Sequence, residues 1–189
     1  MNLPNKLTTF RVILIPFFVF FLLAPYFEGY GNYIALVIFI VASLTDFLDG
    51  KIARKYNLVT NFGKFMDPLA DKILVTAALI YFIPLGLAPA WIVILILARE
   101  FLVTSLRLIA SGKGIVIAAD KWGKYKTATT MVWICYALLM TNFIDTMSIG
   151  MQSVCTGIHI ALMILSLALT LLSGFNYLWK NRALIAQAK

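Results

Sequence analysis

The chain has 189 residues, of which 62% are hydrophobic and 13% are charged, and its formal net charge is +8. Soluble domains are nearer half apolar and a quarter charged, so this composition excludes a disordered chain or a disulfide scaffold and argues against a soluble globular enzyme. A helix needs about 20 mostly apolar residues to span a bilayer, which leaves room for about six such helices.

Six apolar segments follow one another along the chain, and each is long enough to span a membrane. We expect spanning helices at residues 9–27, 32–55, 62–83, 89–110, 121–142 and 152–178. The segment Met1–Thr8 is too polar to span, so we expect a short interfacial helix ahead of the first span. No Ser/Gly-rich linker or repeat divides the chain. The sequence therefore predicts a single all-α, polytopic membrane domain over residues 1–189.

The basic residues predict the orientation of these helices. The expected loops 28–32, 84–89 and 143–151 contain no Lys or Arg, and all sixteen basic residues lie at or toward the opposite ends of the spans. Basic residues mark cytoplasmic loops, so both termini are expected in the cytoplasm. We expect the helices to lie in the plasma membrane. We assign the positive charge to lipid headgroups and expect no nucleic acid as a partner, because no basic face is interleaved with stacking aromatic residues.

Three residues with reactive side chains lie in apolar stretches. Cys135 and Cys155 form no C-x-x-C pair and have no zinc-like spacing to His159, the only histidine. We therefore expect all three to be packing or interface residues.

Four of the eight acidic residues lie at the facing ends of the second and third expected helices. Asp46 and Asp49 are spaced i, i+3, and Asp67 and Asp71 are spaced i, i+4, so each pair shares one helix face. If the turn near residues 56–61 is short, the two pairs reach similar depth. Two carboxylates about 5 Å apart repel by about 3 kcal/mol at an effective dielectric of about 20. Hard divalent cations such as Mg²⁺, Mn²⁺ or Ca²⁺ would relieve this repulsion, and two of them would neutralise four carboxylates.

Other interpretations of this acidic cluster stay open. The carboxylates could be helix caps in a structural subunit, or part of an ion or proton pathway. Ionisable groups in membrane segments are functional candidates by default, which argues against simple caps. The acids gather at one depth, and the fifth and sixth expected helices contain no matching acids, which argues against a pathway across the membrane.

Small and basic residues accompany the acidic cluster. Gly50 and Ala53 leave room for a ligand against the backbone or for close helix packing, and Arg54 could hold a phosphate. Gly63 could be a helix start or a second point of close approach. Pro68 could kink the third helix or mark its first residue.

The full pattern is Asp46-x2-Asp49-Gly50-x2-Ala53-Arg54-x8-Gly63-x3-Asp67-x3-Asp71. At all eight positions it matches the signature of the CDP-alcohol phosphotransferases, and the six-span layout extends this resemblance to nearly the whole chain. The resemblance implies an intramembrane transferase with a cytoplasm-facing site, often homodimeric. It also implies that the four aspartates bind two divalent cations, Mg²⁺ or Mn²⁺. By the same resemblance Asp71 is the general base, and the CDP moiety is bound by Gly50, Ala53, Arg54 and Gly63.

Other stretches resemble one branch of the family, which acts on sn-glycerol 3-phosphate. They are the N-terminal text from Asn2 to Arg11, Ser43–Gly50, Asp67–Lys72 and Ala98–Phe101. The resemblance implies that the primary hydroxyl of sn-glycerol 3-phosphate attacks the lipid-side phosphorus of CDP-diacylglycerol and that CMP leaves. Inositol phosphate, serine or phosphatidylglycerol as the acceptor stays open.

An anionic acceptor should meet fixed cations and hydrogen-bond donors. The candidates for binding its phosphate are Thr8, Arg11, Arg99, Arg107, Lys124 and Lys126. Arg99 is near the middle of its expected span and is the most costly of these to bury. It either pairs internally with Glu100 or binds the acceptor, and the lysines either bind the acceptor or face headgroups. Ser111–Gly114 lacks the full spacing of a phosphate loop, so we expect the fourth helix to end there.

Overall fold

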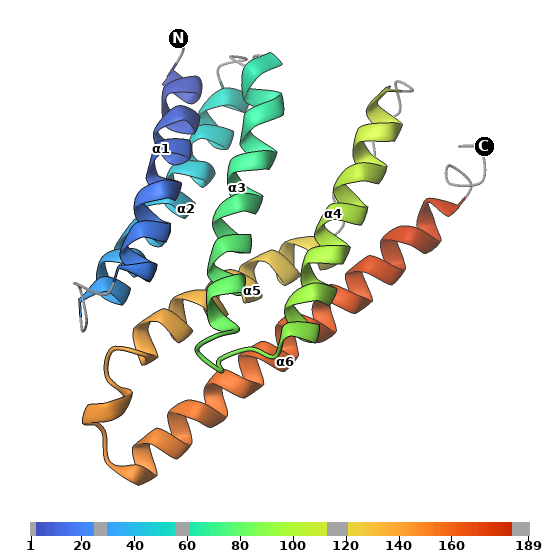
Figure 1. The fold of residues 1–189 in the computed structure, drawn as a ribbon. Coiled ribbons are helices and arrows are strands. Elements are labelled where there is room, and N and C mark those ends of the chain that lie inside the picture. Colours follow the sequence, from blue (N-terminus) through green and yellow to red (C-terminus); the bar gives the residue numbers. More distant parts are fainter. Residues whose placement is uncertain (1–2, 25–29, 56–60, 113–120, 183–189) are drawn as a thin grey trace. The chain divides into compact units, whose positions relative to one another are not determined.

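The computed structural model is all-helical in the residues that it describes, which are 3–24, 30–55, 61–112 and 121–182. Within the helices, the side chains of residues 3–5, 47–55, 61–68, 71 and 111–112 lie outside the description. The described residues form α1 (Leu3–Leu23), α2 (Gly31–Lys55), α3 (Asn61–Phe82), α4 (Ala90–Gly112), α5 (Lys121–Met140), the short 3₁₀ helix η2 (Ile144–Thr146) and α6 (Ile149–Lys180) (Figure 1). The expected all-α fold is confirmed.

The helices lie where the apolar segments predict them, except at the beginning of α1. The expected separate interfacial helix is wrong, because Leu3–Thr8 form the first turns of α1. No Gly or Pro separates Thr8 from the apolar run, and Pro4 lies in the first turn, where its missing N–H costs no hydrogen bond. The alternative that the third helix begins at Pro68 is also wrong, since α3 begins at Asn61.

Two helices in the described part of the chain are long and apolar enough to cross a membrane. They are Lys6–Leu23 within α1 and Ile149–Lys180, which is the whole of α6. With a rise of 1.5 Å per residue, α6 is about 48 Å long, which exceeds a hydrocarbon core of about 30 Å. At least one end of α6 therefore extends beyond such a core. Shorter apolar stretches occupy Gly31–Asp46 and Lys72–Phe82.

The chain divides into two compact units, which we describe separately. The first unit comprises Met1–Tyr81 and Cys135–Gln152, and the second comprises Phe82–Ile134 and Ser153–Lys189.

In the first unit, α1 packs along α2 (Figure 1). Ala35 and Ala42 of α2 are completely buried, and small residues allow two helices to approach closely where no water drives them together. The rings of Phe18 and Phe39 meet between these helices at 5.9 Å between centroids. This packing holds α1 against the helix that carries Asp46.

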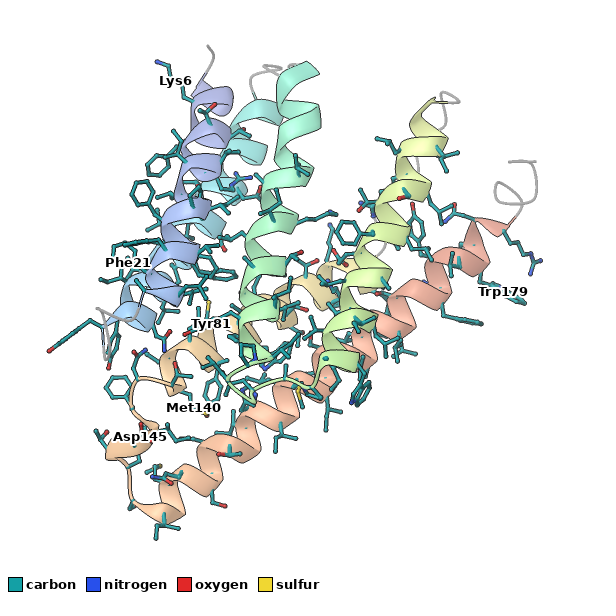
Figure 2. The ribbon with its side chains drawn as sticks, viewed as in Figure 1. Lys6, Phe21, Tyr81, Met140, Asp145 and Trp179 are labelled. Atoms are coloured by element: carbon teal, nitrogen blue, oxygen red, sulfur yellow. The ribbon has the colours of Figure 1, made fainter. Side chains whose placement is uncertain are left out.

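One hydrogen-bonded residue joins three helix ends in the first unit. The hydroxyl of Tyr81, which lies at the end of α3 (Figure 2), donates to Oδ1 of Asn32 at 3.3 Å. The amide of Asn32, at the start of α2, donates to Oγ1 of Thr141 at 3.1 Å. The start of α2 is thereby fixed to the end of α3, which defines the register of the two helices.

In the second unit, the turn from α3 to α4 is closed by a glycine. Gly86 has φ +68°, a conformation that residues with a Cβ rarely adopt. Its N–H donates to the carbonyl of Ile83 at 3.0 Å, and the N–H of Leu87 donates to the carbonyl of Phe82 at 3.0 Å. This pair of bonds is the Schellman motif of a helix C-terminus, and it explains why the helix stops beside Pro84 as the sequence predicts.

The buried face of α6 is polar in the second unit. Ser166, Thr170, Ser173 and Gly174 are all buried, and Ser166 Oγ lies 2.6 Å from Oγ1 of Thr130 on α5. Hydroxyl pairs of this kind hold helices together where both have apolar outer faces. His159 is also buried, and its Nε2 lies 2.7 Å from the carbonyl oxygen of Leu87, as expected for a packing residue. Neither cysteine forms a disulfide in the described part of the chain, and both are partly buried.

Candidate functional site

The register of α2 and α3 brings the signature aspartates into one band of the first unit. Asp46 lies 14 residues after Asn32, and Asp67 lies 14 residues before Tyr81. At 1.5 Å per residue, both are about 21 Å along their helices from the Asn32–Tyr81 hydrogen bond. By the same measure Asp49 is about 26 Å and Asp71 about 15 Å from that bond. Asp46 and Asp67 are therefore level along the two helices, and Asp49 and Asp71 lie within about 6 Å of that level, one toward each side.

The donor set of this aspartate band suits a hard cation. Carboxylate oxygens are the ligands that Mg²⁺ and Mn²⁺ prefer, and the i, i+3 and i, i+4 spacings present two such groups on each helix face. Among the side chains that the structure describes, no group of three or more His, Cys, Asp or Glu could hold a metal ion. The side chains of Asp49, Asp67 and Asp71 are outside that set, whereas Asp46 belongs to it.

Asp46 has a basic partner on α1. Nη1 of Arg11 lies 2.6 Å from Oδ1 of Asp46. The contact is close but is not aligned as a hydrogen bond, so we treat it as an ion pair. The Arg11 side chain is 1% exposed and that of Asp46 is 36% exposed, so the guanidinium is far more deeply buried than the carboxylate.

Thr8 and Arg11 therefore have a different environment from the one that the sequence suggested. Thr8 is 1% exposed and lies one turn before Arg11 on the same face of α1. The structure links Arg11 to a signature aspartate instead of leaving it as an accessible cation. The residues predicted to bind CDP lie on α2 and α3: Gly50, Ala53, Arg54 and Gly63. The structure describes their backbone but not the environment of their side chains.

The second unit contains a basic cluster built around one carboxylate. Arg99 Nη1 on α4 lies 2.8 Å from Oε1 of Glu100, and Lys126 Nζ on α5 lies 2.7 Å from the same oxygen. Lys126 is almost completely buried, and Arg99 and Glu100 are largely buried. The internal pair of Arg99 with Glu100, one of the two alternatives that the sequence left open, is therefore present, and binding of the acceptor by Arg99 stays a prediction. Since two cations share one anion, the trio carries a net charge of +1.

Two glycines lie beside the other edge of the Arg99 guanidinium. A Cβ at Gly123 on α5 would come within 3.7 Å of Nη2. A Cβ at Gly174 on α6 would come within 3.0 Å of Cγ and 3.9 Å of Nε. Nε is buried and has no hydrogen-bond partner among the described residues. The Arg99 guanidinium is therefore held by Glu100 at Nη1, and the backbone of two glycines lies beside its Nε–Nη2 edge.

The remaining predicted acceptor ligands are less enclosed. Arg107 is exposed and lies over the ring of Tyr177, with 5.5 Å between Cζ and the ring centroid. Lys124 is exposed at the start of α5. The structure thus brings Arg99 and Lys126 together, and it does not join Arg107 or Lys124 to them through any ion pair among the described residues.

Sequence reasoning missed three contributors to this cluster. Glu100 was considered only as a partner for Arg99, although it also binds Lys126, which lies 26 residues later. Gly123 and Gly174 were not predicted, because a lone glycine in an apolar helix indicates close packing without saying what packs on it. No spacing pattern in the sequence could have found either glycine.

Comparison with known proteins gives consistent matches. The model of the family CDP-alcohol phosphatidyltransferase matches residues 1–173. A Bacillus subtilis protein named CDP-diacylglycerol–glycerol-3-phosphate 3-phosphatidyltransferase is 44% identical over 190 residues, covering 95% of both chains. A protein of the same name from Shigella flexneri serotype 5b is 38% identical over 188 residues, covering 96% of both chains. A Mycobacterium tuberculosis protein named probable phosphatidylglycerophosphate synthase is 37% identical over 186 residues, covering 93% of this chain and 79% of its own length.

Proposed function

The chain belongs to the CDP-alcohol phosphatidyltransferase family and is an enzyme of that family, and we propose that it transfers the phosphatidyl group of CDP-diacylglycerol to the primary hydroxyl of sn-glycerol 3-phosphate. The products are phosphatidylglycerophosphate and CMP. The observation that carries this proposal is the match of the chain, over nearly its full length, to relatives named for this reaction. The complete aspartate signature on α2 and α3 supports it.

We propose that Asp46, Asp49, Asp67 and Asp71 hold two divalent cations, Mg²⁺ or Mn²⁺. When bound, such cations neutralise the diphosphate and the charge that develops on the departing CMP. Asp71 accepts the proton of the attacking hydroxyl, which makes the oxygen a better nucleophile. Gly50, Ala53, Arg54 and Gly63 bind the CDP moiety, with Arg54 donating to its phosphates.

The phosphate of the acceptor is bound by Arg99 and Lys126, with Arg107 and Lys124 contributing to the attraction of the anion. Arg99 and Lys126 are supported by their burial and by their contact with the same oxygen of Glu100, which holds the two cations together. For Arg11 the ion pair with Asp46 supports a different role, which is to hold the Asp46 carboxylate on the α2 face. Thr8 is buried one turn before Arg11 on the same face of α1, so we assign it to the packing around Arg11.

We also propose that all six long helices cross the plasma membrane, with both termini in the cytoplasm. The outer faces of the helices carry exposed large apolar side chains, which suit lipid contact: examples are Val37, Leu44, Ile73, Ile80, Ile94, Phe101, Val132 and Leu139. Trp91, Trp122 and Trp179 are exposed near helix ends, where tryptophan marks the membrane–water interface. Trp179 projects from the end of α6 in Figure 2. A homodimer is the expected assembly of the family.

A rival proposal within the family is a different acceptor, such as inositol phosphate, serine or phosphatidylglycerol. The decisive experiment measures CMP release by purified protein in detergent with CDP-diacylglycerol, Mg²⁺ and one acceptor at a time. We expect release with sn-glycerol 3-phosphate and a loss of at least about 100-fold in Asp71→Asn, the lower range for removal of a general base. Asp145→Asn, an exposed carboxylate in η2, is the matched control and should keep full activity.

Release with another acceptor alone would replace the acceptor and keep the family chemistry. If folded protein released CMP with none of the acceptors, with either Mg²⁺ or Mn²⁺, the transferase proposal would fail. Ion flux in proteoliposomes without CDP-lipid would then be the next measurement.

A further inference from the structure

In the basic cluster of the second unit, two cationic side chains share one carboxylate. Arg99 and Lys126 meet on a single oxygen, Oε1 of Glu100, at 2.8 and 2.7 Å. The two cationic nitrogens are therefore within about 5.5 Å of each other, a separation at which like charges repel strongly in a poorly solvated site. Glu100 removes this repulsion and fixes both side chains on one side of α4.

The Glu100 contact also determines which edge of Arg99 is available. A guanidinium binds a phosphate with two parallel N–H groups, and the Nε–Nη2 edge is one such pair. In Arg99, Nη1 is occupied by Glu100, whereas Nε is buried without a hydrogen-bond partner among the described residues. A buried donor without an acceptor is costly, so this edge is suited to receive an anion.

The surroundings of this edge are shaped by absent side chains. Gly123 borders Nη2, and Gly174 borders the Arg99 stem, where an added Cβ would lie 3.0 Å from Cγ and 3.9 Å from Nε, so no Cβ from α5 or α6 stands at these two places. Gly157 on α6 has nothing within 4 Å of an added Cβ, so a glycine is not required everywhere on this helix. Gly123 and Gly174 thus differ from Gly157 because a side chain at either position would contact Arg99.

We propose that Glu100 is a positioning residue that holds Arg99 and Lys126 as a preformed receptor for a phosphomonoester, with the phosphate on the Nε–Nη2 edge of Arg99 beside Gly123 and Gly174. This inference rests on the proposed function, because the phosphomonoester is that of the acceptor sn-glycerol 3-phosphate. It assigns a role to three residues that do not belong to the signature of the family. The receptor selects acceptors that carry a phosphate over the same alcohol without one.

The first test replaces Glu100 by Gln, which keeps the shape and removes the charge. Without the carboxylate, the repulsion between Arg99 and Lys126 separates the two side chains, so the receptor loses one of its cationic contacts. We expect KM for sn-glycerol 3-phosphate to rise about tenfold or more, while KM for CDP-diacylglycerol stays within about twofold. Glu100→Asp, which keeps the charge on a shorter side chain, should recover part of the loss. Asp145→Asn is the matched control for removal of a negative charge.

The second test keeps Arg99, Glu100 and Lys126 and adds a methyl group beside Arg99 by replacing Gly123 with Ala. Alanine at Gly123 makes an ordinary contact of 3.7 Å with Nη2, so the fold is expected to tolerate it. Its methyl group occupies space that the phosphate needs, and KM for sn-glycerol 3-phosphate should rise severalfold without a change in thermal stability. Gly157→Ala is the matched control and should change neither. Inhibition by inorganic phosphate should weaken in parallel in Glu100→Gln and Gly123→Ala.

Several results would overturn the proposal. A lower KM for sn-glycerol 3-phosphate in Glu100→Gln would show that Glu100 competes with the phosphate. An unchanged KM in Gly123→Ala, or equal changes in both KM values, would show a structural role only. Wild-type protein that does not use sn-glycerol 3-phosphate would instead contradict the proposed function, so the two failures are distinguishable.

Discussion

The ion pair of Arg11 and Asp46 offers a direct test of how the first unit holds its aspartate band. Arg11 is fully buried on α1, whereas the Asp46 side chain is 36% exposed on α2. Removing the carboxylate takes the ion pair with Asp46 from a guanidinium that water does not reach. Removing the guanidinium leaves a carboxylate that water can solvate. The two single substitutions are therefore expected to differ, even though they break the same contact.

The magnitudes follow from this asymmetry. Taking about 4 Å between the charge centres and an effective dielectric of about 20, the attraction is about 4 kcal/mol, and partial exposure of Asp46 reduces it to about 2 kcal/mol. Loss of one partner of a buried pair costs about 3–5 kcal/mol, and we expect the lower end for Asp46→Asn. For Arg11→Met we expect about 1 kcal/mol, because methionine fills much of the volume and Asp46 becomes hydrated.

The assay is thermal unfolding in detergent with EDTA, so that no divalent cation contributes. For a chain of this length 1 kcal/mol corresponds to a shift of about 2–4 °C in Tm. Asp46→Asn should lower Tm by about 6–12 °C and Arg11→Met by about 2–4 °C. The double variant should resemble Arg11→Met, giving a coupling energy of about 3 kcal/mol. Additive effects, or a larger loss in Arg11→Met than in Asp46→Asn, would refute the reasoning.

Three further predictions concern stability and orientation. Gly86→Ala should lower Tm by about 2–4 °C, since φ +68° costs a residue with a Cβ about 1 kcal/mol; an unchanged Tm would mean that the α3–α4 turn relaxes. Thr130→Val and Ser166→Ala should destabilise less together than the sum of the two, with a coupling of about 0.6–2 kcal/mol in unfolding measurements, because their hydroxyls are partners at 2.6 Å. In a chain with Cys135 and Cys155 replaced by Ala, Ser148→Cys should react with an impermeant maleimide in intact cells, and Lys180→Cys only after permeabilisation. Labelling of both from the same side would contradict a spanning α6.

The helix positions could be predicted because they depend on local information, and the aspartate cluster stays a prediction drawn from the same local spacing. Apolar runs separated by short polar or Pro/Gly-containing segments define where helices begin and end to within a few residues. The similar depth of Asp49 and Asp67 followed from counting residues on each side of a short turn. The Asn32–Tyr81 bond now defines the register independently. The beginning of α1 was predicted wrongly because polar residues can form the first turns of a spanning helix when no Gly or Pro separates them from the apolar run.

The contacts between distant segments could not be predicted in this way. Arg11 and Asp46 are 35 residues apart, and the basic character of Arg11 suited an acceptor ligand equally well in the sequence. Lys126 resembled its neighbours at the start of α5, yet it is nearly completely buried while Lys124 is exposed. Burial separates these lysines, and burial depends on the packing of α4 and α5, which has no pattern in the sequence around either residue.

The formal charge of each polar cluster agrees with the ligand that we propose for it. In the first unit, four signature aspartates lie on α2 and α3, and one of them, Asp46, pairs with Arg11. A set of carboxylates of this kind suits the divalent cations that we propose there. In the second unit, Arg99 and Lys126 share the single carboxylate of Glu100, so these three side chains together carry a formal charge of +1, which suits the phosphate that we propose there. Charged groups among apolar helices are costly, so functional ligands are the expected partners of both clusters.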